Sequence, residues 1–192
     1  MILYLHGFRS GPQSQKVQAL AARMHARGLG DQLWCAQLSP VPFEAIAQAD
    51  AQIERCLKSG VQPALAGSSL GGFYVTHLAE KHGLKAVAIN PFVPHADFDQ
   101  SLFIGEHETL YSGEHFTFTT EHAAQIAALD TPRLSQPEKL WLLAEEGDEV
   151  LDYRYAVARY AGSRQTVLPG GDHGFTRWED YLDEVIAFAG IG

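Results

Sequence analysis

The stretch Ala64-Leu65-Ala66-Gly67-Ser68-Ser69-Leu70-Gly71-Gly72-Phe73 decides the fold that we expect of this chain. It carries the pattern Gly-x-Ser-x-Gly centred on Ser69, follows a short apolar run and opens a segment with helical spacing. A tight turn from a strand into a helix lifts a serine hydroxyl above a parallel sheet, and glycines flank it because side chains would collide there. Ser68 does not fit, because alanine stands two residues before it. The stretch predicts a nucleophile elbow at Ser69, with a plain polar turn as the alternative.

Composition and charge are those of an ordinary globular chain. The 192 residues are 46% hydrophobic and 19% charged, and we expect them to form one domain over residues 1–192. The net charge of −9 disfavours nucleic acid and anionic membrane as partners. The chain has no apolar run of membrane-spanning length and no basic, signal-like start. Cys35 and Cys56 lie far apart without metal-type spacing, so we expect free thiols and a cytoplasmic protein.

Apolar runs alternate with segments of helical spacing along most of the chain. Strands are predicted at residues 2–5, 33–38, 64–66, 85–89, 140–144 and 165–168. Helices are predicted at residues 15–27, 43–58, 70–82, 120–129, 153–160 and 178–189. This order predicts an α/β fold with a mostly parallel sheet of about six strands and helices on both faces. The aromatic-rich stretch at about 91–136 breaks the rhythm, and we expect a lid-like insertion over the carboxyl edge of the sheet.

A serine nucleophile needs a histidine base and an acid that orients the base. In α/β-hydrolases these residues follow one another in the order serine, acid, histidine. His173 lies in a glycine-rich loop after the last predicted strand, and Asp148 follows the strand before it. These two residues are our candidates for base and acid, although an exposed loop histidine and a solvated acidic run would look similar. The other acids near predicted strand ends are Asp152, which suits a helix cap, Asp97, Asp99, and the turn-like Asp172.

The developing oxyanion needs N–H donors from the backbone. One is expected from Leu70, directly after the nucleophile, and the other from Phe8, in the loop after the first strand. Gly7 allows the tight path that such a loop needs. For His6 we expect a side chain that packs or hydrogen-bonds behind this loop rather than a metal ligand.

Several blocks of the chain resemble the YqiA-type bacterial esterases, which are small members of the α/β-hydrolase superfamily. The blocks are Tyr4–Ser10 with Pro12-Gln13-Ser14, Gly67–Phe73, Asn90-Pro91, Ile104-Gly105-Glu106, Tyr111–Glu114, Glu121-His122, Gly147–Tyr153 and Gly171–Phe175. The resemblance runs from residue 1 to about 185. It implies a minimal α/β-hydrolase that cleaves short acyl esters without a cofactor, with Ser69 as nucleophile, Asp148 as acid and His173 as base.

We therefore expect a serine carboxylesterase that acts on short-to-medium acyl esters through an acyl-enzyme. One alternative is an acyl-CoA thioesterase with the same triad, which the acidic net charge disfavours unless Arg9, Arg133, Lys139 or Arg154 gather near the site. The other is a non-catalytic ligand-binding protein on this fold. No metal-ligand spacing is present among the scattered histidines, so we expect no metal site, and the resemblance implies that no cofactor is needed. The oligomeric state stays open.

Overall fold

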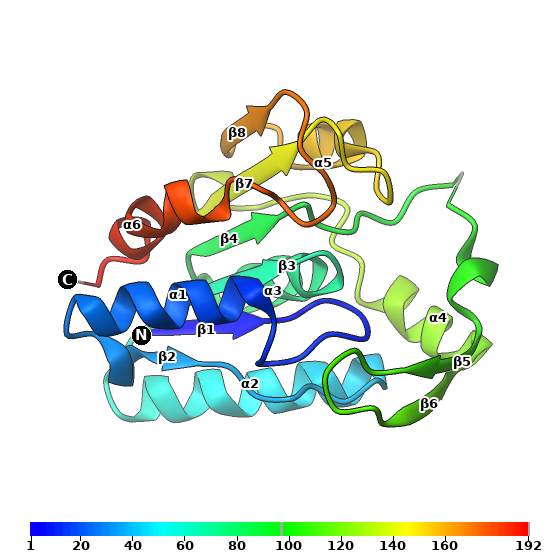
Figure 1. Ribbon diagram of the computed structural model, residues 1–192, viewed down its shortest axis with the longest axis horizontal. Helices are drawn as coiled ribbons and strands as arrows, with labels where there is room; N and C mark the ends of the chain where they lie inside the picture. Colours follow the sequence, from blue (N-terminus) through cyan, green and yellow to red (C-terminus); the bar gives the residue numbers. More distant parts are fainter. Residues whose placement is uncertain (97, 192) are drawn as a thin grey trace.

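A parallel sheet forms the centre of the molecule. A computed structural model describes residues 1–96 and 98–191, and Figure 1 shows the sheet lying between two layers of helices. Its strand order is β2 (Leu33–Trp34), β1 (Ile2–Leu5), β3 (Ala64–Ser68), β4 (Ala86–Ile89), β7 (Leu140–Glu145), β8 (Arg164–Leu168). Every neighbouring pair in this order is parallel. The predicted α/β architecture with six strands is confirmed.

Alternating side chains of each strand face two separate cores. Ile2 and Tyr4 of β1 pack with α1 (Gln15–Ala26) and α6 (Trp178–Phe188) on one face of the sheet. Leu3 and Leu5 pack on the other face, which is covered by α2 (Pro42–Lys58), α3 (Leu70–His82) and α5 (Tyr153–Arg159). Because both faces are buried, the inner strands β1 and β4 are continuous apolar runs, as is usual in parallel sheets, whereas the edge strand β8 begins with polar residues.

Local signals explain where the helices begin and end. The carboxylate of Asp152 accepts a hydrogen bond from the N–H of Arg154 and caps the start of α5. Gly83 ends α3 in the left-handed conformation, at φ 64°. Thr119 and His122 form a reciprocal capping box at the start of α4 (Thr120–Ala128).

The segment between β4 and β7 lies beyond the carboxyl ends of the sheet strands (Figure 1). It contains an antiparallel hairpin of β5 (Gly105–Glu108) and β6 (His115–Phe118), followed by α4. The predicted helix at 120–129 is confirmed, but the hairpin was not predicted. β5 is polar throughout, and the alternation of β6, with Phe116 and Phe118, covers only four residues, so the sequence signal for strands is weak. The lid-like role of about residues 91–136 stays a prediction.

The second strand is shorter than predicted. It was expected over residues 33–38, but β2 ends at Trp34. After Trp34 the chain no longer pairs with β1 and instead runs beside the loop that follows β1. There Leu38 donates its N–H to His6 Nε2 at 3.0 Å. The side-chain amide of Gln37 also donates to the Ser10 carbonyl at 3.1 Å. This part of the chain therefore bonds to the loop instead of extending the sheet.

No helix within residues 1–96 and 98–191 is both long enough and apolar enough to cross a bilayer.

The contact between α3 and β1 gives a first prediction. A Cβ at Gly71 would lie 2.0 Å from the Leu5 carbonyl oxygen. Gly71→Ala should therefore lower the free energy of unfolding by about 3 kcal/mol or more, measured by urea denaturation. Gly60→Ala is the control, because nothing lies within 4 Å of its Cβ and only its φ of +79° is unfavourable. It should cost about 1 kcal/mol. Equal losses in both variants would contradict the prediction.

Candidate active site

Ser69 occupies the turn between β3 and α3, where the sequence places it. Its backbone has φ 55° and ψ −122°, a strained combination for a residue other than glycine. The turn is held on both sides, since Ser69 N–H donates to the Ile89 carbonyl and Phe92 N–H donates to the Ser69 carbonyl, each at 3.0 Å. A Cβ at Gly67 would lie 2.4 Å from the Gly71 carbonyl oxygen, so the pattern needs a glycine here. This local geometry raises the Ser69 hydroxyl above the edge of the sheet.

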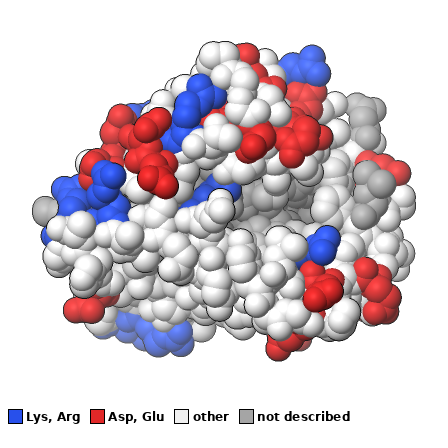
Figure 2. Space-filling view, in the orientation of Figure 1, with Lys and Arg blue, Asp and Glu red and all other residues white. Residues whose placement is uncertain are grey.

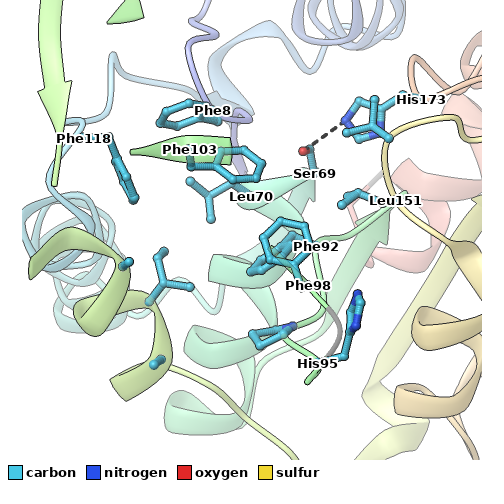
Figure 3. Close-up of a pocket in the computed structure, with 15 residues that line it drawn as sticks. Phe8, Ser69, Leu70, Phe92, His95, Phe98, Phe103, Phe118, Leu151 and His173 are labelled. Atoms are coloured by element: carbon cyan, nitrogen blue, oxygen red, sulfur yellow. Dashed lines mark hydrogen bonds between the residues drawn. The ribbon is translucent and has the colours of Figure 1, made fainter. Parts of the chain in front are cut away.

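Ser69, His173 and Asp148 form a continuous chain of hydrogen-bonding groups. The distance from His173 Nε2 to Ser69 Oγ is 3.1 Å, and Figure 3 shows this contact at the mouth of a cavity. On the other side of the ring, Nδ1 lies 2.9 Å from both carboxylate oxygens of Asp148. The Asp148 side chain is 2% exposed and the His173 side chain 24% exposed, so the carboxylate is buried behind the imidazole ring. The arrangement is suited to moving a proton from the hydroxyl to the imidazole.

The other acids considered in the sequence have different contacts. Asp152 accepts hydrogen bonds from the backbone N–H and guanidinium of Arg154, and the side-chain contact lowers the pKa of Asp152 to about 2. Asp99 caps a short 3-10 turn by accepting from Ser101 N–H at 2.9 Å. Asp172 is joined to Glu145 through its backbone N–H. Asp97 lies outside the described residues. Of the acids described, Asp148 is the one that contacts the His173 ring.

The backbone next to Ser69 offers N–H groups to a bound oxyanion. Leu70 is the first residue of α3, where a helix leaves its N–H groups without internal partners. Phe8 N–H has no hydrogen-bond partner among the described residues. Gly7 brings its loop close to the elbow, because a Cβ there would lie 3.2 Å from Ser69 Cβ. The positions of Phe8 and Leu70 are therefore compatible with donors on either side of a tetrahedral oxygen.

Glu145 holds the loop that carries His173, a role that was not predicted from the sequence. This residue ends β7, is 0% exposed, and accepts hydrogen bonds from the N–H groups of Asp172 and Thr176 at 2.9 Å. Its carboxylate also pairs with Arg177 Nε at 2.8 Å. Burial alone would raise the pKa of Glu145, but the hydrogen bonds from Arg177, Asp172 and Thr176 outweigh it and hold that pKa below its ordinary value. A carboxylate at the end of a buried apolar strand, which needs partners, was the available signal.

Asn90 supports the same loop from β4. Its side-chain N–H group donates to the carbonyls of Asp172 and His173 at 3.0 and 3.2 Å. Its side-chain oxygen accepts from Glu145 N–H at 2.9 Å. Asn90 is 4% exposed and has a φ of 38°. The carboxyl ends of β4 and β7 and the histidine loop are thus joined through one buried amide.

A cavity of about 220 Å³ opens beside Ser69 and His173. Figure 3 shows aromatic rings around it, and none of the labelled side chains is a lysine, an arginine or a carboxylate. The walls come from the first loop, the segment after β4, the hairpin and α4, and include Phe8, Phe92, Phe98, Phe103, Phe118 and Ile126. Figure 2 shows that this face of the molecule is hollowed, with acidic side chains above and below the hollow.

A second cavity adjoins the other side of the same serine and histidine. Its volume is about 430 Å³, and its lining mixes aromatic rings with polar side chains, among them Ser10, Ser14, Gln15, Lys16 and Tyr111. Ser69 therefore lies where an apolar and a mixed cavity meet. In the part of the chain that the structure describes, histidine, cysteine and carboxylate side chains do not gather in threes that could hold a metal ion.

The buried carboxylate of Glu145 gives a second prediction. Its folded-state pKa is lowered, so the charge stabilises the fold above the unfolded value of about 4.3 and loses this effect as the pH falls through the folded-state pKa. Glu145→Gln should lower the free energy of unfolding at pH 7 by about 3 kcal/mol and make it less dependent on pH below 5, measured by urea titrations at several pH values. Glu146→Gln, at the exposed neighbouring position, is the control. Identical pH profiles for the two variants would refute the role of Glu145.

The fold is shared with solved enzymes of low sequence identity. A monoacylglycerol lipase from Paleococcus ferrophilus superposes with a TM-score of 0.72 and 14% identity, covering 97% of this chain and 94% of that chain. For Est1E from Butyrivibrio proteoclasticus the TM-score is 0.66 and the sequence identity 17%, and the match covers 97% of this chain and 85% of that chain. For the esterase domain of a Rhodothermus marinus protein the TM-score is 0.63 and the sequence identity 17%, and the match covers 98% of this chain and 85% of that chain.

These similarities confirm the α/β-hydrolase fold. The sequence itself matches a family model over residues 1–190. The chain belongs to UPF0227, an uncharacterised protein family, and this match confirms the resemblance to the YqiA-type group.

Proposed function

We propose that this chain is a carboxylic ester hydrolase in which Ser69 is the nucleophile, His173 the general base and Asp148 the acid that orients the base. The observation that carries the proposal is the hydrogen-bonded chain from Asp148 through both ring nitrogens of His173 to the Ser69 hydroxyl. It ends at the mouth of an apolar cavity, where an acyl group can be bound away from water. The structural neighbours named as esterases and lipases share the fold with this chain, but a shared fold does not fix the function. The proposal therefore rests on the geometry of the site itself.

The chemistry proceeds in two acyl transfers. His173 Nε2 takes the Ser69 proton as Oγ attacks the ester carbonyl, and the Phe8 and Leu70 N–H groups stabilise the tetrahedral oxyanion. The tetrahedral intermediate then collapses, and its bond to the alkoxy oxygen breaks as the protonated imidazole gives that oxygen its proton. The alcohol leaves, and the acyl group remains on Ser69 Oγ as an ester. A water molecule attacks this ester with His173 again as base, and the acid is released as Ser69 regains its proton. Asp148 keeps Nδ1 protonated and stabilises the charged ring in both steps.

The two cavities bind different parts of the substrate. The apolar cavity takes the acyl group, because its wall of phenylalanine rings gains from burying a hydrocarbon chain or ring of short-to-medium size. The alcohol departs on the side of the second cavity, whose wall includes the histidine loop itself through Asp172, His173 and Gly174. The leaving oxygen is thus released next to the imidazole that protonates it.

An ester fits the surroundings better than a thioester with a polyanionic leaving group. Lys139 donates to the Gly83 carbonyl near the amino end of β7, away from the site. Arg154 is paired with Asp152. Arg9 donates to the Glu108 carbonyl, so these three basic side chains are committed elsewhere. Lys16 is then the lysine in the lining of the second cavity, and one positive charge is few for a polyanionic leaving group.

An activity-based probe tests the proposal directly. A fluorophosphonate should add once to the wild-type protein and not to Ser69→Ala, as measured by intact-mass spectrometry, because only an activated serine attacks it. Ser68→Ala is the matched control and should still be labelled. A folded wild-type protein that takes up no probe would refute the nucleophile and favour a non-catalytic binding protein.

The choice of acid is tested by paired substitutions. Asp148→Asn should lower kcat for an activated ester by about 10⁴, because the amide cannot hold the histidine in the required protonation state. Asp152→Asn should change kcat little, because Asp152 caps α5 away from the His173 ring and asparagine is an equally good cap. If the losses are exchanged between the two variants, the acid is misassigned.

A further inference from the structure

The loop after β1 is joined to a hairpin that is remote in the sequence. Arg9 Nε donates to the Glu108 carbonyl at 2.9 Å, across 99 residues of chain. Leu110 N–H donates in turn to the Arg9 carbonyl at 2.8 Å. One residue of the loop thus holds the hairpin on both sides of Thr109, through groups on both its backbone and its side chain.

The neighbouring residue of the loop inserts its ring into the same hairpin. Phe8 packs edge-on against Phe103, His107, Phe116 and Phe118, with centroid distances of 5.4, 4.9, 5.6 and 5.3 Å. Three of these rings belong to β5 and β6. Figure 3 shows Phe8, Phe103 and Phe118 together at one side of the apolar cavity. The side chain of Phe8 is therefore fixed by the hairpin, while its N–H lies beside the nucleophile.

The loop is also held from behind. Leu38 N–H donates to His6 Nε2, and burial lowers the pKa of His6, so the ring is neutral at pH 7 and can accept this bond. Gln37 donates to the Ser10 carbonyl. This agrees with the expected place of His6 behind the loop. Residues 6–10 are thus held between segment 37–38 on one side and the hairpin on the other.

Arg9 has a backbone conformation that needs such support. Its φ is +59°, a region that residues with a Cβ rarely adopt outside special contexts. The hydrogen bonds to Glu108 and Leu110 are made in this conformation. Without them, relaxation of Arg9 toward negative φ would displace Phe8, whose neighbour Gly7 lies against Ser69.

From these contacts we infer that the β5–β6 hairpin is the outer support of the oxyanion hole, and that Arg9 is the positioning residue through which it acts. The inference rests on the proposed function. It gives the insertion a role in transition-state stabilisation, since a displaced Phe8 N–H would meet the carbonyl oxygen at a longer distance or a poorer angle. Arg9 itself does not contact the reacting atoms.

The test compares Arg9→Met with Arg9→Lys. Methionine keeps the aliphatic chain without a donor, whereas lysine keeps a donor of similar reach. Each protein hydrolyses an ester and the matched thionoester, whose sulfur is a poor hydrogen-bond acceptor and gains little from an oxyanion hole. Infrared spectroscopy also records the carbonyl stretch of the acyl-enzyme, which strong hydrogen bonds lower.

We expect Arg9→Met to lower kcat for the ester about tenfold, less than the loss of a complete donor, with KM nearly unchanged. The ester-to-thionoester rate ratio should fall in parallel, and the carbonyl stretch should rise. Arg9→Lys should restore part of each effect. Arg27→Met, which removes an exposed arginine paired with Asp183 on α6, should leave all three values at the wild-type level.

A wild-type rate ratio and carbonyl stretch in Arg9→Met would overturn the inference, as would a lower kcat with both readouts unchanged. If Arg9→Met does not fold, Phe8→Leu, which removes the ring contacts with the hairpin, is measured in the same way and judged by the same outcomes. A wild-type protein that forms no acyl-enzyme would overturn the proposed function, and this inference with it. The two failures are distinguishable, because an acyl-enzyme with an unaffected carbonyl contradicts only the role of the hairpin.

Discussion

The site depends on one constraint: the backbones of β1, β3 and the start of α3 approach one another so closely that no side chain fits between them. A Cβ at Gly71 of α3 would collide with the Leu5 carbonyl, and one at Gly67 of β3 would collide with the backbone of Gly71. Leu5 immediately precedes the loop that carries Phe8, and Gly71 follows Ser69 by two residues. The same contact therefore sets the position of Ser69 and of the loop next to it, because backbone segments packed this closely cannot shift past each other.

Strain and the groups that offset it are concentrated around this contact. Among the described residues, the non-glycine residues with positive φ are Arg9, Ser69, Asn90 and Phe175, and each lies in a loop or turn at the site. Such conformations persist only where the surroundings determine them. The loop after β7 supplies much of that support on the histidine side. Glu145 holds the backbone of Asp172, Glu149 accepts from His173 N–H at 3.0 Å, and Asp148 holds the ring. The neighbouring parallel strands β7 and β8 bring these loops side by side.

The sequence predicted those parts of the molecule whose signals are local. The elbow is a contiguous pattern, and the order of strands placed Asp148 and His173 at adjacent strand ends, where the structure brings them together. The hairpin escaped prediction because Gly105–Glu108 and His115–Phe118 pair mainly polar residues, and their few aromatic rings meet Phe8 only in the folded chain. The role of Glu145 escaped prediction because it begins an acidic run in which Glu146 and Glu149 are exposed, while its partner Arg177 lies 32 residues away. Contacts of this kind depend on tertiary structure, which local periodicity does not contain.

Asn90 explains how the separately built halves of the site keep their spacing. Ser69 is positioned by glycine packing at β1 and β3, whereas His173 and its loop are held by carboxylates at the end of β7 and in the loop after it. Between them lies β4, whose last residue precedes Asn90. Its side chain holds the backbone of His173, and the adjoining Pro91 lies so close to Gly72 of α3 that a Cβ there would be 2.8 Å from it. The distance of 3.1 Å between Ser69 Oγ and His173 Nε2 therefore depends on the contacts of the Asn90 side chain and of Pro91, and not on the loops alone.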